Sequence, residues 1–398
     1  MFIITRAELM EEKKKELRVA FVSDAAFPWH KGGLEAVERT EADELAKVYD
    51  VHFLSLRWPD MPSGLEFIDN GVHFHPLAGT DINKFYRHGR RSIRTSVKFA
   101  LSSLRIFRYL LGKRFDVIEA NVFPFLHVPI VRLYCRLTGC RLILDVVEVW
   151  SREYWLEYLG PIGGRLGRWF AMTFCFGADH YIANSSTTAG KLEREGVASS
   201  RISVFAPILD DSAIRKVMLE PARRSPRVVF WGRLIKEKRL DRWLSVMREV
   251  TRRMPSARGT IVGGGPESAN VGALIRKMGL SGKVEHKPFI ERGDDLFRLV
   301  RSSSVLLHMS EREGLGLIAL ESLALGVPVV LPSYSPIPRE VKEMCIVEEE
   351  QAIPERVLQI LKSKDKGRFI RHREGLKRFE ISNTVPFYSD LFRRLGLR

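Results

Sequence analysis

The sequence predicts an α/β protein of two domains, each built around a mainly parallel sheet. The chain has 398 residues, which is too long for one compact α/β unit. Two apolar runs, residues 18–24 and 228–231, are each followed by a glycine-containing loop and a helix-length segment. Residues 304–331 read as strand, loop, helix and strand, which is a βαβ unit. Such units assemble into parallel sheets, with ligands bound at the carboxyl ends of the strands.

Breaks in composition predict the domain boundaries. We expect a charged N-terminal extension over residues 1–17 and a first domain over 18–210. The polar, basic stretch 211–227, with Pro221 and Pro226, predicts an interdomain linker. A second domain over 228–375 and a C-terminal segment over 376–398 complete the chain.

The first domain is expected to alternate strands and helices. After the strand at 18–24, Gly32 and Gly33 open a helix that ends near Val48. Backbone can approach a phosphate or a sugar closely at such a glycine pair, although a plain strand-to-helix turn is the alternative. The remaining elements expected in this domain are strands at 51–56, 72–75, 116–120, 141–147, 179–183 and 202–205, and helices at 127–138 and 187–195.

The second domain is expected to follow the same alternation. Its strands are predicted at 228–231, 260–262, 284–290, 305–309 and 327–331. Helices are predicted at 240–254, within 317–325, and at 336–343 and 352–361. Residues 369–395 are expected to form two basic helices.

Charge and composition limit the kinds of partner. The chain has 64 basic and 48 acidic residues, a net charge of +16, which favours an acidic partner such as a nucleotide diphosphate or an anionic lipid. We expect no nucleic acid partner, because the chain has no zinc module and no single-strand stacking motif. The chain lacks a transmembrane-length apolar run and an apolar signal-peptide core, so we expect a cytoplasmic protein. Cys135, Cys140, Cys175 and Cys345 are expected to be buried free thiols.

Residues 84–115 form a basic segment with two interpretations. It has ten Lys or Arg residues, interleaved with apolar side chains, and no Asp or Glu. Such a segment is typical of a helix that lies on an anionic membrane surface, here the inner face of the cell membrane. The alternative is an Arg-rich helix whose apolar stripe packs on its own domain.

The loop of the βαβ unit at 304–331 predicts an anion and sugar site. Gly314 and Gly316 allow close approach of the backbone, and a helix starting near Gly316 directs free N–H groups at a phosphate. Glu313 and Glu321 frame these glycines, at positions where carboxylates can accept hydrogen bonds from sugar hydroxyls. The alternative is a loop with two solvated glutamates. Residues 314–319 also fit the dinucleotide fingerprint G-x-G-x-x-A, but the acidic residue expected about 20 positions on is missing.

Two further stretches carry candidate chemistry. Arg233 and Lys238 follow the strand at 228–231, where two cations can neutralise a departing diphosphate; a solvated basic turn is the alternative. The chain has no Asp-x-Asp triplet, so we expect no metal ion and no cofactor. Glu148, Trp150 and Tyr154 lie in an aromatic and acidic loop suited to a carbohydrate acceptor, or to packing between domains.

Residues 310–330 resemble the donor-site motif of the retaining glycosyltransferases of family 4. The resemblance implies the GT-B architecture, two Rossmann-like domains facing across a cleft, with a final helix that crosses back to the first domain. It implies that Glu313 lies by the transferred sugar and that Glu321 binds the ribose hydroxyls. It also implies that Arg233 and Lys238 hold the donor phosphates. The remaining donor-site residues that it implies are Gly32, Gly33, Ile290, Gly314, Leu315, Gly316, Leu317 and Ile318, with Ile290 at the nucleotide base.

The first domain departs from the family pattern in two places. Val147 stands where related chains usually have a histidine that contacts the donor sugar, although Glu148 follows it as expected. Residues 206–210, APILD, stand where the family commonly has Pro-Asn-Gly before an aspartate. These departures put full activity in doubt.

The expected function is therefore retaining, metal-independent transfer of a hexose-type sugar. The donor is a nucleotide-diphosphate sugar, and the acceptor is a hydroxyl group on a glycan or a lipid-linked sugar. No carboxylate is placed as a covalent nucleophile, so we expect substitution on one face of the sugar. Two alternatives remain: a catalytically weak protein that binds a nucleotide-sugar or a glycolipid, and a nucleotide-sugar epimerase.

Overall fold

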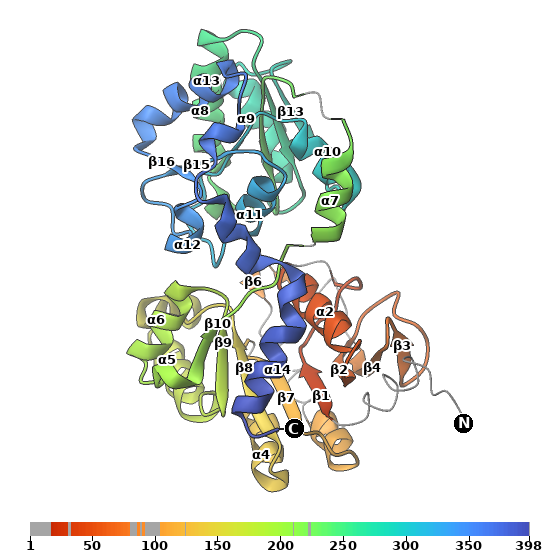
Figure 1. The fold of residues 1–398 in the computed structure, drawn as a ribbon. Helices are drawn as coiled ribbons and strands as arrows, with labels where there is room; N and C mark the ends of the chain where they lie inside the picture. The colour runs from red at the N-terminus through yellow and green to blue at the C-terminus, as the bar shows by residue number, and fades with distance from the viewer. Residues whose placement is uncertain are drawn as a thin grey trace, which may run out of the picture. The chain divides into compact units, whose positions relative to one another are not determined.

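The protein divides into two units, each with its own sheet (Figure 1). The computed structural model describes residues 17–30, 33–79, 86–87, 90–91, 104–123, 125–209, 211–221 and 224–397. The first unit consists of Met1–Pro207 and Ile381–Arg398, and the second of Ile208–Glu380. Each unit has its own apolar core.

The first unit contains an eight-stranded sheet in the order β10-β9-β8-β7-β1-β2-β4-β3. All neighbouring strands are parallel except β3 and β4. The central strands are apolar and buried because helices cover both faces of the sheet. The strands are β1 (Arg18–Val22), β2 (Asp50–Arg57), β3 (Phe67–Asp69), β4 (Val72–Gly79), β7 (Val117–Asn121), β8 (Arg141–Val146), β9 (His180–Ala183) and β10 (Ile202–Val204).

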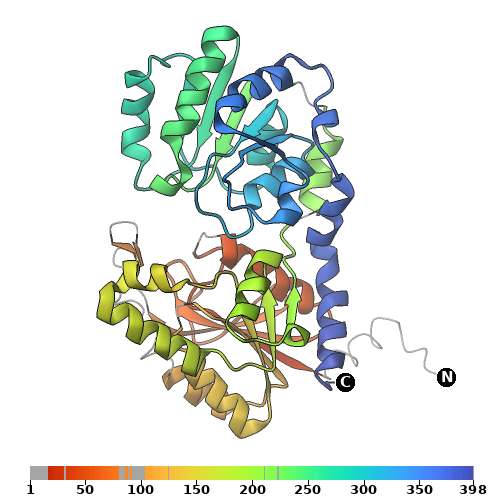
Figure 2. The ribbon, with the colours of Figure 1, turned by 90° about the vertical axis from the view of Figure 1, so that its left-hand side faces the viewer.

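The helices of the first unit lie on the two faces of this sheet. Right-handed crossovers place α4 (Val128–Thr138), α5 (Arg152–Phe170) and α6 (Ser186–Arg194) on one face and α2 (Gly33–Leu45) on the other. The last helix, α14 (Thr384–Arg394), lies beside α2 (Figure 2). It adds three side chains to the core of the first unit. These side chains are Tyr388, Leu391 and Phe392. The Ser185 side chain caps α6, and a short π-helix, η2 (Ala171–Cys175), extends α5.

The basic segment 84–115 is not one continuous helix. Strands β5 (Tyr86–Arg87) and β6 (Arg90–Arg91) form an antiparallel pair inside it, and residues 104–111 are helical. In this helical part Ile106 and Leu110 are buried in the core of the first unit, so their stripe packs on its own domain. The rest of the segment lies outside the described residues. In the part of the chain that the structure describes, no helix combines the length and the apolar composition that crossing a bilayer needs.

The second unit contains a six-stranded, fully parallel sheet in the order β13-β12-β11-β14-β15-β16. Its strands are β11 (Arg227–Trp231), β12 (Arg258–Val262), β13 (Val284–Lys287), β14 (Val305–Leu307), β15 (Val329–Pro332) and β16 (Ile346–Glu348). Its helices are α7 (Asp211–Leu219), α8 (Leu240–Arg253), α9 (Ser268–Lys277), α10 (Asp294–Arg301), α11 (Leu317–Ala324), α12 (Arg339–Lys342) and α13 (Ile353–Lys362).

Two expectations about connecting segments are corrected. The segment expected as a linker, 211–227, contains helix α7, which belongs to the second unit. The guanidinium group of Arg301 on α10 donates hydrogen bonds to the carbonyl oxygens of Val217, Met218 and Glu220 and so caps the end of α7. The first of the two C-terminal helices expected over 369–395 is a 3₁₀ helix, Arg373–Phe379, and the second is α14.

The core of the first unit contains a cluster of buried carboxylates. Glu38 and Glu41 on α2, Glu119 on β7 and Asp145 on β8 are all buried, and Tyr388 on α14 lies beside them. Asn121 Nδ2 donates a hydrogen bond of 3.0 Å to Glu38 Oε1. Burial, with the charge of Asp145 added, raises the pKa of Glu119 to about 8, and burial raises the pKa of Asp145 to about 7. The cluster therefore carries protons at neutral pH.

We predict that this cluster makes the first unit less stable as the pH rises. The folded state holds protons on Glu119 and Asp145 up to about pH 8 and 7, whereas the unfolded chain releases them near ordinary carboxyl pKa values. Each extra proton in the folded state lowers the free energy of unfolding by about 1.4 kcal/mol per unit of rising pH within this window. Urea denaturation at about pH 6 and about pH 8 checks the slope.

Glu119→Gln should flatten this pH dependence, because the amide cannot ionise. The matched control is Glu193→Gln, at an exposed position on α6, which should keep the slope of the natural chain. An unchanged slope in Glu119→Gln would contradict the assignment.

Candidate functional site

The candidate site of the second unit lies where β11 and β14 end. These strands are parallel neighbours, with Val228 opposite Val305, so their carboxyl ends meet at one edge of the sheet. The turn after β11 contains Arg233 and the short 3₁₀ helix Lys236–Lys238. The amide N–H of Glu311 donates a hydrogen bond of 2.9 Å to the carbonyl oxygen of Glu237 and so joins this turn to the loop after β14. The turn and the loop are thereby held together.

A buried ion pair lies at this junction. Lys238 Nζ pairs with Glu313 Oε1, and His308 Nε2 lies 2.8 Å from the same oxygen. The His308 side chain is fully buried, while those of Lys238 and Glu313 are 15% and 13% exposed. Burial alone would raise the pKa of Glu313, but the bond to His308 and the charge of Lys238 outweigh it and lower the pKa to about 2. Glu313 is therefore a carboxylate at neutral pH that accepts hydrogen bonds.

The loop after Glu313 leads into a helix whose first amides are available. Gly316 has a left-handed φ of 90° and precedes α11. A Cβ at this position would lie 2.9 Å from Ile337 Cδ1, so the position requires glycine. The first helical amides bonded within the chain are those of Ala319 and Leu320, both to the carbonyl oxygen of Gly316. The N–H groups of Leu317 and Ile318 thus lie at the free, positive end of the helix, where an anion can bind.

Glu321 has a partner that the sequence did not predict. Arg292 Nε donates a hydrogen bond of 2.5 Å to Glu321 Oε1, and Arg292 Nη2 donates one of 2.8 Å to the carbonyl oxygen of Ile208. Glu321 is buried, with 5% of the residue exposed. The carboxylate expected at the ribose is therefore held in place by a guanidinium group.

Close packing of glycine backbones positions the turn that carries Arg233. A Cβ on Gly263 would lie 1.9 Å from the carbonyl oxygen of Gly232, and one on Gly265 would lie 2.5 Å from that of Leu234. The loop after β12 therefore shapes the fold around the turn that carries Arg233. Ile290 follows β13, which is separated from β11 by β12, so the structure does not bring Ile290 next to Glu313.

The candidate residues of the first unit lie in two loops after strands. Gly33 begins α2, and Gly32 lies outside the described residues. Glu148 and Trp150 follow β8, and Tyr154 lies in the first turn of α5. The Trp150 ring packs against neighbouring aromatic rings, with centroid distances of 4.7 to 5.6 Å. These neighbours are Phe123, Phe125, Tyr154, Trp155 and Tyr158. Trp150 and Tyr154 thus pack within the first unit, and their role in acceptor binding stays a prediction.

Sequence reasoning missed His308 and Arg292. His308 interrupts the apolar run 305–309, so a polar residue at the end of a buried strand was a usable signal. Arg292 lies 29 positions from Glu321, and no local pattern links the two.

Two family models match most of the chain. "Glycosyl transferase 4-like domain" matches residues 32–207, and "Glycosyl transferases group 1" matches residues 214–374. Among curated relatives, N-acetyl-alpha-D-glucosaminyl L-malate synthase of Bacillus anthracis is 26% identical over 140 residues, which is 33% of this chain and 36% of that protein. D-inositol 3-phosphate glycosyltransferase of Mycobacterium sp. (strain JLS) is 29% identical over 180 residues, or 42% and 40% of the two chains. The matches thus span less than half of the length of these relatives.

Solved structures share the fold of the whole chain. HepE of Anabaena, in complex with UDP and glucose, has a TM-score of 0.65 at 14% identity and covers 95% of this chain and 100% of its own. Sucrose-phosphate synthase from Thermosynechococcus elongatus has a TM-score of 0.70 at 16% identity, with 96% and 99% covered. Both are GT-B proteins, so the predicted GT-B fold is confirmed.

We predict that Lys238→Met destabilises the protein by about 3 kcal/mol near pH 7, because it leaves the buried Glu313 carboxylate without its cation. In the natural chain the depressed pKa of Glu313 contributes stability above its ordinary value of 4.5, and this contribution is lost as the pH falls toward about 2. The difference between the two proteins should therefore shrink at about pH 4, where protonation of Glu313 removes the unpaired charge of the variant. Urea denaturation at both pH values measures this.

Lys236→Met is the matched control. Lys236 lies in the same 3₁₀ turn but is exposed, so its loss should change the stability little. Equal stability of the two variants would show that the Lys238–Glu313 pair contributes nothing.

Proposed function

Because this chain belongs to the GT-B glycosyltransferases of family 4 type, we propose that it transfers a hexose-type sugar from a nucleotide-diphosphate sugar to a hydroxyl acceptor, with retention of configuration. One observation carries the proposal. The buried Lys238–Glu313 pair lies at the carboxyl edge of a parallel sheet, in the loop that leads to the free amides of α11. A cation, an ionised carboxylate and a helix N-terminus together suit a sugar diphosphate.

The donor diphosphate is proposed to bind between Arg233, Lys238 and the start of α11. The backbone of residues 314–318 provides amide donors, with Leu317 and Ile318 at the free end of the helix. The Lys238 ammonium group has three donors, so it can keep Glu313 and still reach a phosphate oxygen. The structural relative HepE was solved with UDP and with UDP-glucose, which supports a donor of this class.

The transfer is proposed to take place on one face of the sugar. The bond between the anomeric carbon and the phosphate oxygen breaks while the acceptor oxygen forms its bond on the same face. The acceptor proton moves to the departing diphosphate, whose negative charge Arg233 and Lys238 stabilise. Glu313, ionised at neutral pH, accepts hydrogen bonds from sugar hydroxyls and orients the ring. We propose that the two cations act in place of a metal ion and that no cofactor is needed.

Glu321 and Ile290 are proposed to hold the nucleoside. Arg292 bonds to Oε1 of Glu321, and the second carboxylate oxygen can accept from a ribose hydroxyl. Ile290 is proposed to meet the base through its backbone. Gly32 and Gly33 are proposed to bind the donor. Glu148, Trp150 and Tyr154 are proposed to bind a glycan or lipid-linked acceptor. A cytoplasmic location, with attachment to the inner face of the cell membrane, stays a prediction from the sequence.

We predict that Arg233→Ala lowers the rate of sugar transfer by a factor of about 10² to 10³, since one charge contact to the leaving group is lost. The donor is first identified by thermal stabilisation with UDP-, GDP-, ADP- and TDP-sugars, each beside its free nucleotide. A ligand at a hundred times its dissociation constant adds about 2.7 kcal/mol of stability.

Lys236→Ala, which removes an exposed cation from the same turn, should transfer at the natural rate. Unchanged turnover of a folded Arg233→Ala protein would refute the assignment. Product analysis without an acceptor detects an epimerase, since only an epimerase then changes the sugar.

We predict that Val147→His changes the transfer rate by less than about tenfold, because Glu313 and the two cations are already in place. A much larger gain would favour the alternative, a binding protein whose site is impaired by Val147. The rate with the identified donor measures this, and Val147→Ala controls for the change in side-chain volume.

A further inference from the structure

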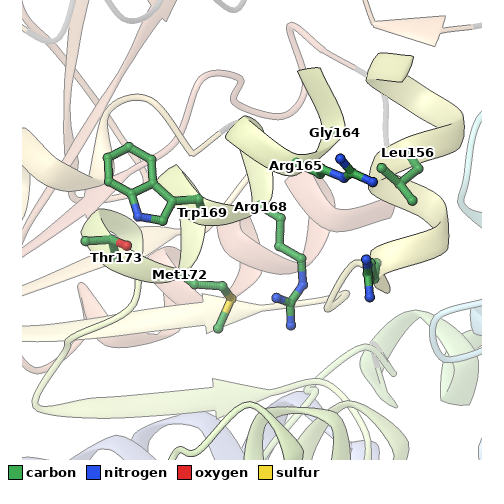
Figure 3. A pocket seen from close by; sticks show the side chains of 8 residues that line it. Leu156, Gly164, Arg165, Arg168, Trp169, Met172 and Thr173 are labelled. Atoms are coloured by element: carbon green, nitrogen blue, oxygen red, sulfur yellow. The ribbon is translucent and has the colours of Figure 1, made fainter. Parts of the chain in front are cut away.

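The α5 element is a helical hairpin, and side chains from both of its halves line a pocket (Figure 3). Gly160, with φ 77°, interrupts the helix. The second half folds back on the first, because a Cβ on Gly164 would lie 2.4 Å from the carbonyl oxygen of Trp155. The pocket has a volume of about 390 Å³. Its lining combines cations with apolar surface, from Arg152, Arg165, Arg168, Leu156, Trp169 and Met172.

An exposed apolar stripe runs along the second half of the hairpin. Ile162, Leu166 and Trp169 are 76%, 60% and 60% exposed and are spaced four and three residues apart, so they lie on one face of the helix. Phe174 on η2 continues the stripe at 40% exposure, and its ring lies 5.6 Å from that of Trp169. No part of the described chain covers these side chains.

The charge of the second half of the hairpin and of η2 has one sign, whereas the first half carries the exposed acids Glu153 and Glu157. Residues 158–178 contain Arg165 and Arg168 but no Asp or Glu. Arg168 pairs with Glu195, whereas no ion pair among the described residues occupies Arg152 or Arg165. Two guanidinium groups are therefore available beside the stripe.

The two neighbouring helices on the same face of the sheet share this character. Leu133 and Leu137 on α4 are 49% and 65% exposed, and Leu104 and Leu111 on the helix at 104–111 are 62% and 58% exposed. These two helices contain arginines and no acidic residue. Eight of the sixteen large hydrophobic side chains exposed in the described chain lie on this face, so apolar surface is concentrated there.

We infer that the outer face of the α5–η2 hairpin docks on a membrane of anionic phospholipid, with the pocket holding a lipid phosphate group. Tryptophan and aliphatic side chains enter the interfacial region of a bilayer, and arginines beside them pair with lipid phosphates. The positive charge of the arginines matches the negative charge of the lipid phosphates. This match favours an anionic membrane as the partner, because binding through the apolar patch alone would not require cations beside it. This hairpin is distinct from the basic segment 84–103, and the inference is independent of sugar transfer.

The test is flotation of the full chain with vesicles of phosphatidylglycerol and phosphatidylcholine, beside vesicles of phosphatidylcholine alone. We expect binding to the anionic vesicles and a blue shift of the Trp169 emission, identified by its loss in Trp169→Phe. Arg152→Gln with Arg165→Gln should weaken binding about 25-fold, since each arginine near an anionic surface contributes about fivefold. Leu166→Ser with Trp169→Ser should abolish it.

Matched controls lie elsewhere on the first unit. Leu65→Ser removes an apolar side chain that is 87% exposed, and Arg393→Gln removes an exposed arginine from α14. Both proteins should bind vesicles as the natural chain does. Equal binding by the Arg152/Arg165 protein, or equal binding to both kinds of vesicle, would overturn the inference. The inference would also be overturned if Leu166→Ser with Trp169→Ser changed only the oligomeric state of the protein. This face would then be an interface between copies of the chain.

Discussion

The candidate site of the second unit depends on the buried ion pair between Lys238 and Glu313. Its two partners come from the loops after β11 and β14, which are 75 positions apart in the chain. Each charge of the pair is stabilised by the other, because either group without its partner would be an unpaired buried charge. His308, the residue after β14, bonds to the same carboxylate oxygen and helps to hold it ionised. The position of the cation that is proposed to meet the diphosphate is thus set by a carboxylate.

Glycines allow the turn after β11 to lie close to the loop after β12. The Gly263 backbone packs against the carbonyl oxygen of Gly232, and that of Gly265 against the carbonyl oxygen of Leu234, at distances that exclude a side chain. Gly316 likewise makes room for Ile337 and starts α11 in a left-handed conformation. The geometry of the site therefore requires glycine at these three positions, because a side chain there would collide with neighbouring atoms. A methyl group at Gly263 would push the turn that carries Arg233 away from the loop after β12.

Local patterns in the sequence predicted the alternation of strands and helices and the glycine loop at Glu313, because these depend on nearby residues. They did not predict α7, since a helix capped by the distant Arg301 is stabilised by tertiary contacts that a polar, proline-flanked stretch does not reveal. They also did not predict the hydrogen bond from Arg292 to Glu321, or the burial of Glu38 and Glu41 in the core of the first unit. On α2 these two glutamates read as an ordinary polar face, and only the packing of β7, β8 and α14 buries them.

Glu119 and Glu313 show how the same side chain takes opposite states in the two units. Both are largely buried, so desolvation raises the pKa of each. In the first unit the charge of Asp145 adds to this effect and outweighs the hydrogen bond with Tyr388, which opposes it, so the pKa of Glu119 reaches about 8. In the second unit Lys238 and His308 reverse it, and the pKa of Glu313 falls to about 2. The hydrogen bond with His308 and the nearby positive charge, and not burial, therefore decide that Glu313 keeps its charge. The buried acids of the first unit are neutral and form part of its core. Glu313 stays ionised, so it can accept a hydrogen bond from a sugar hydroxyl.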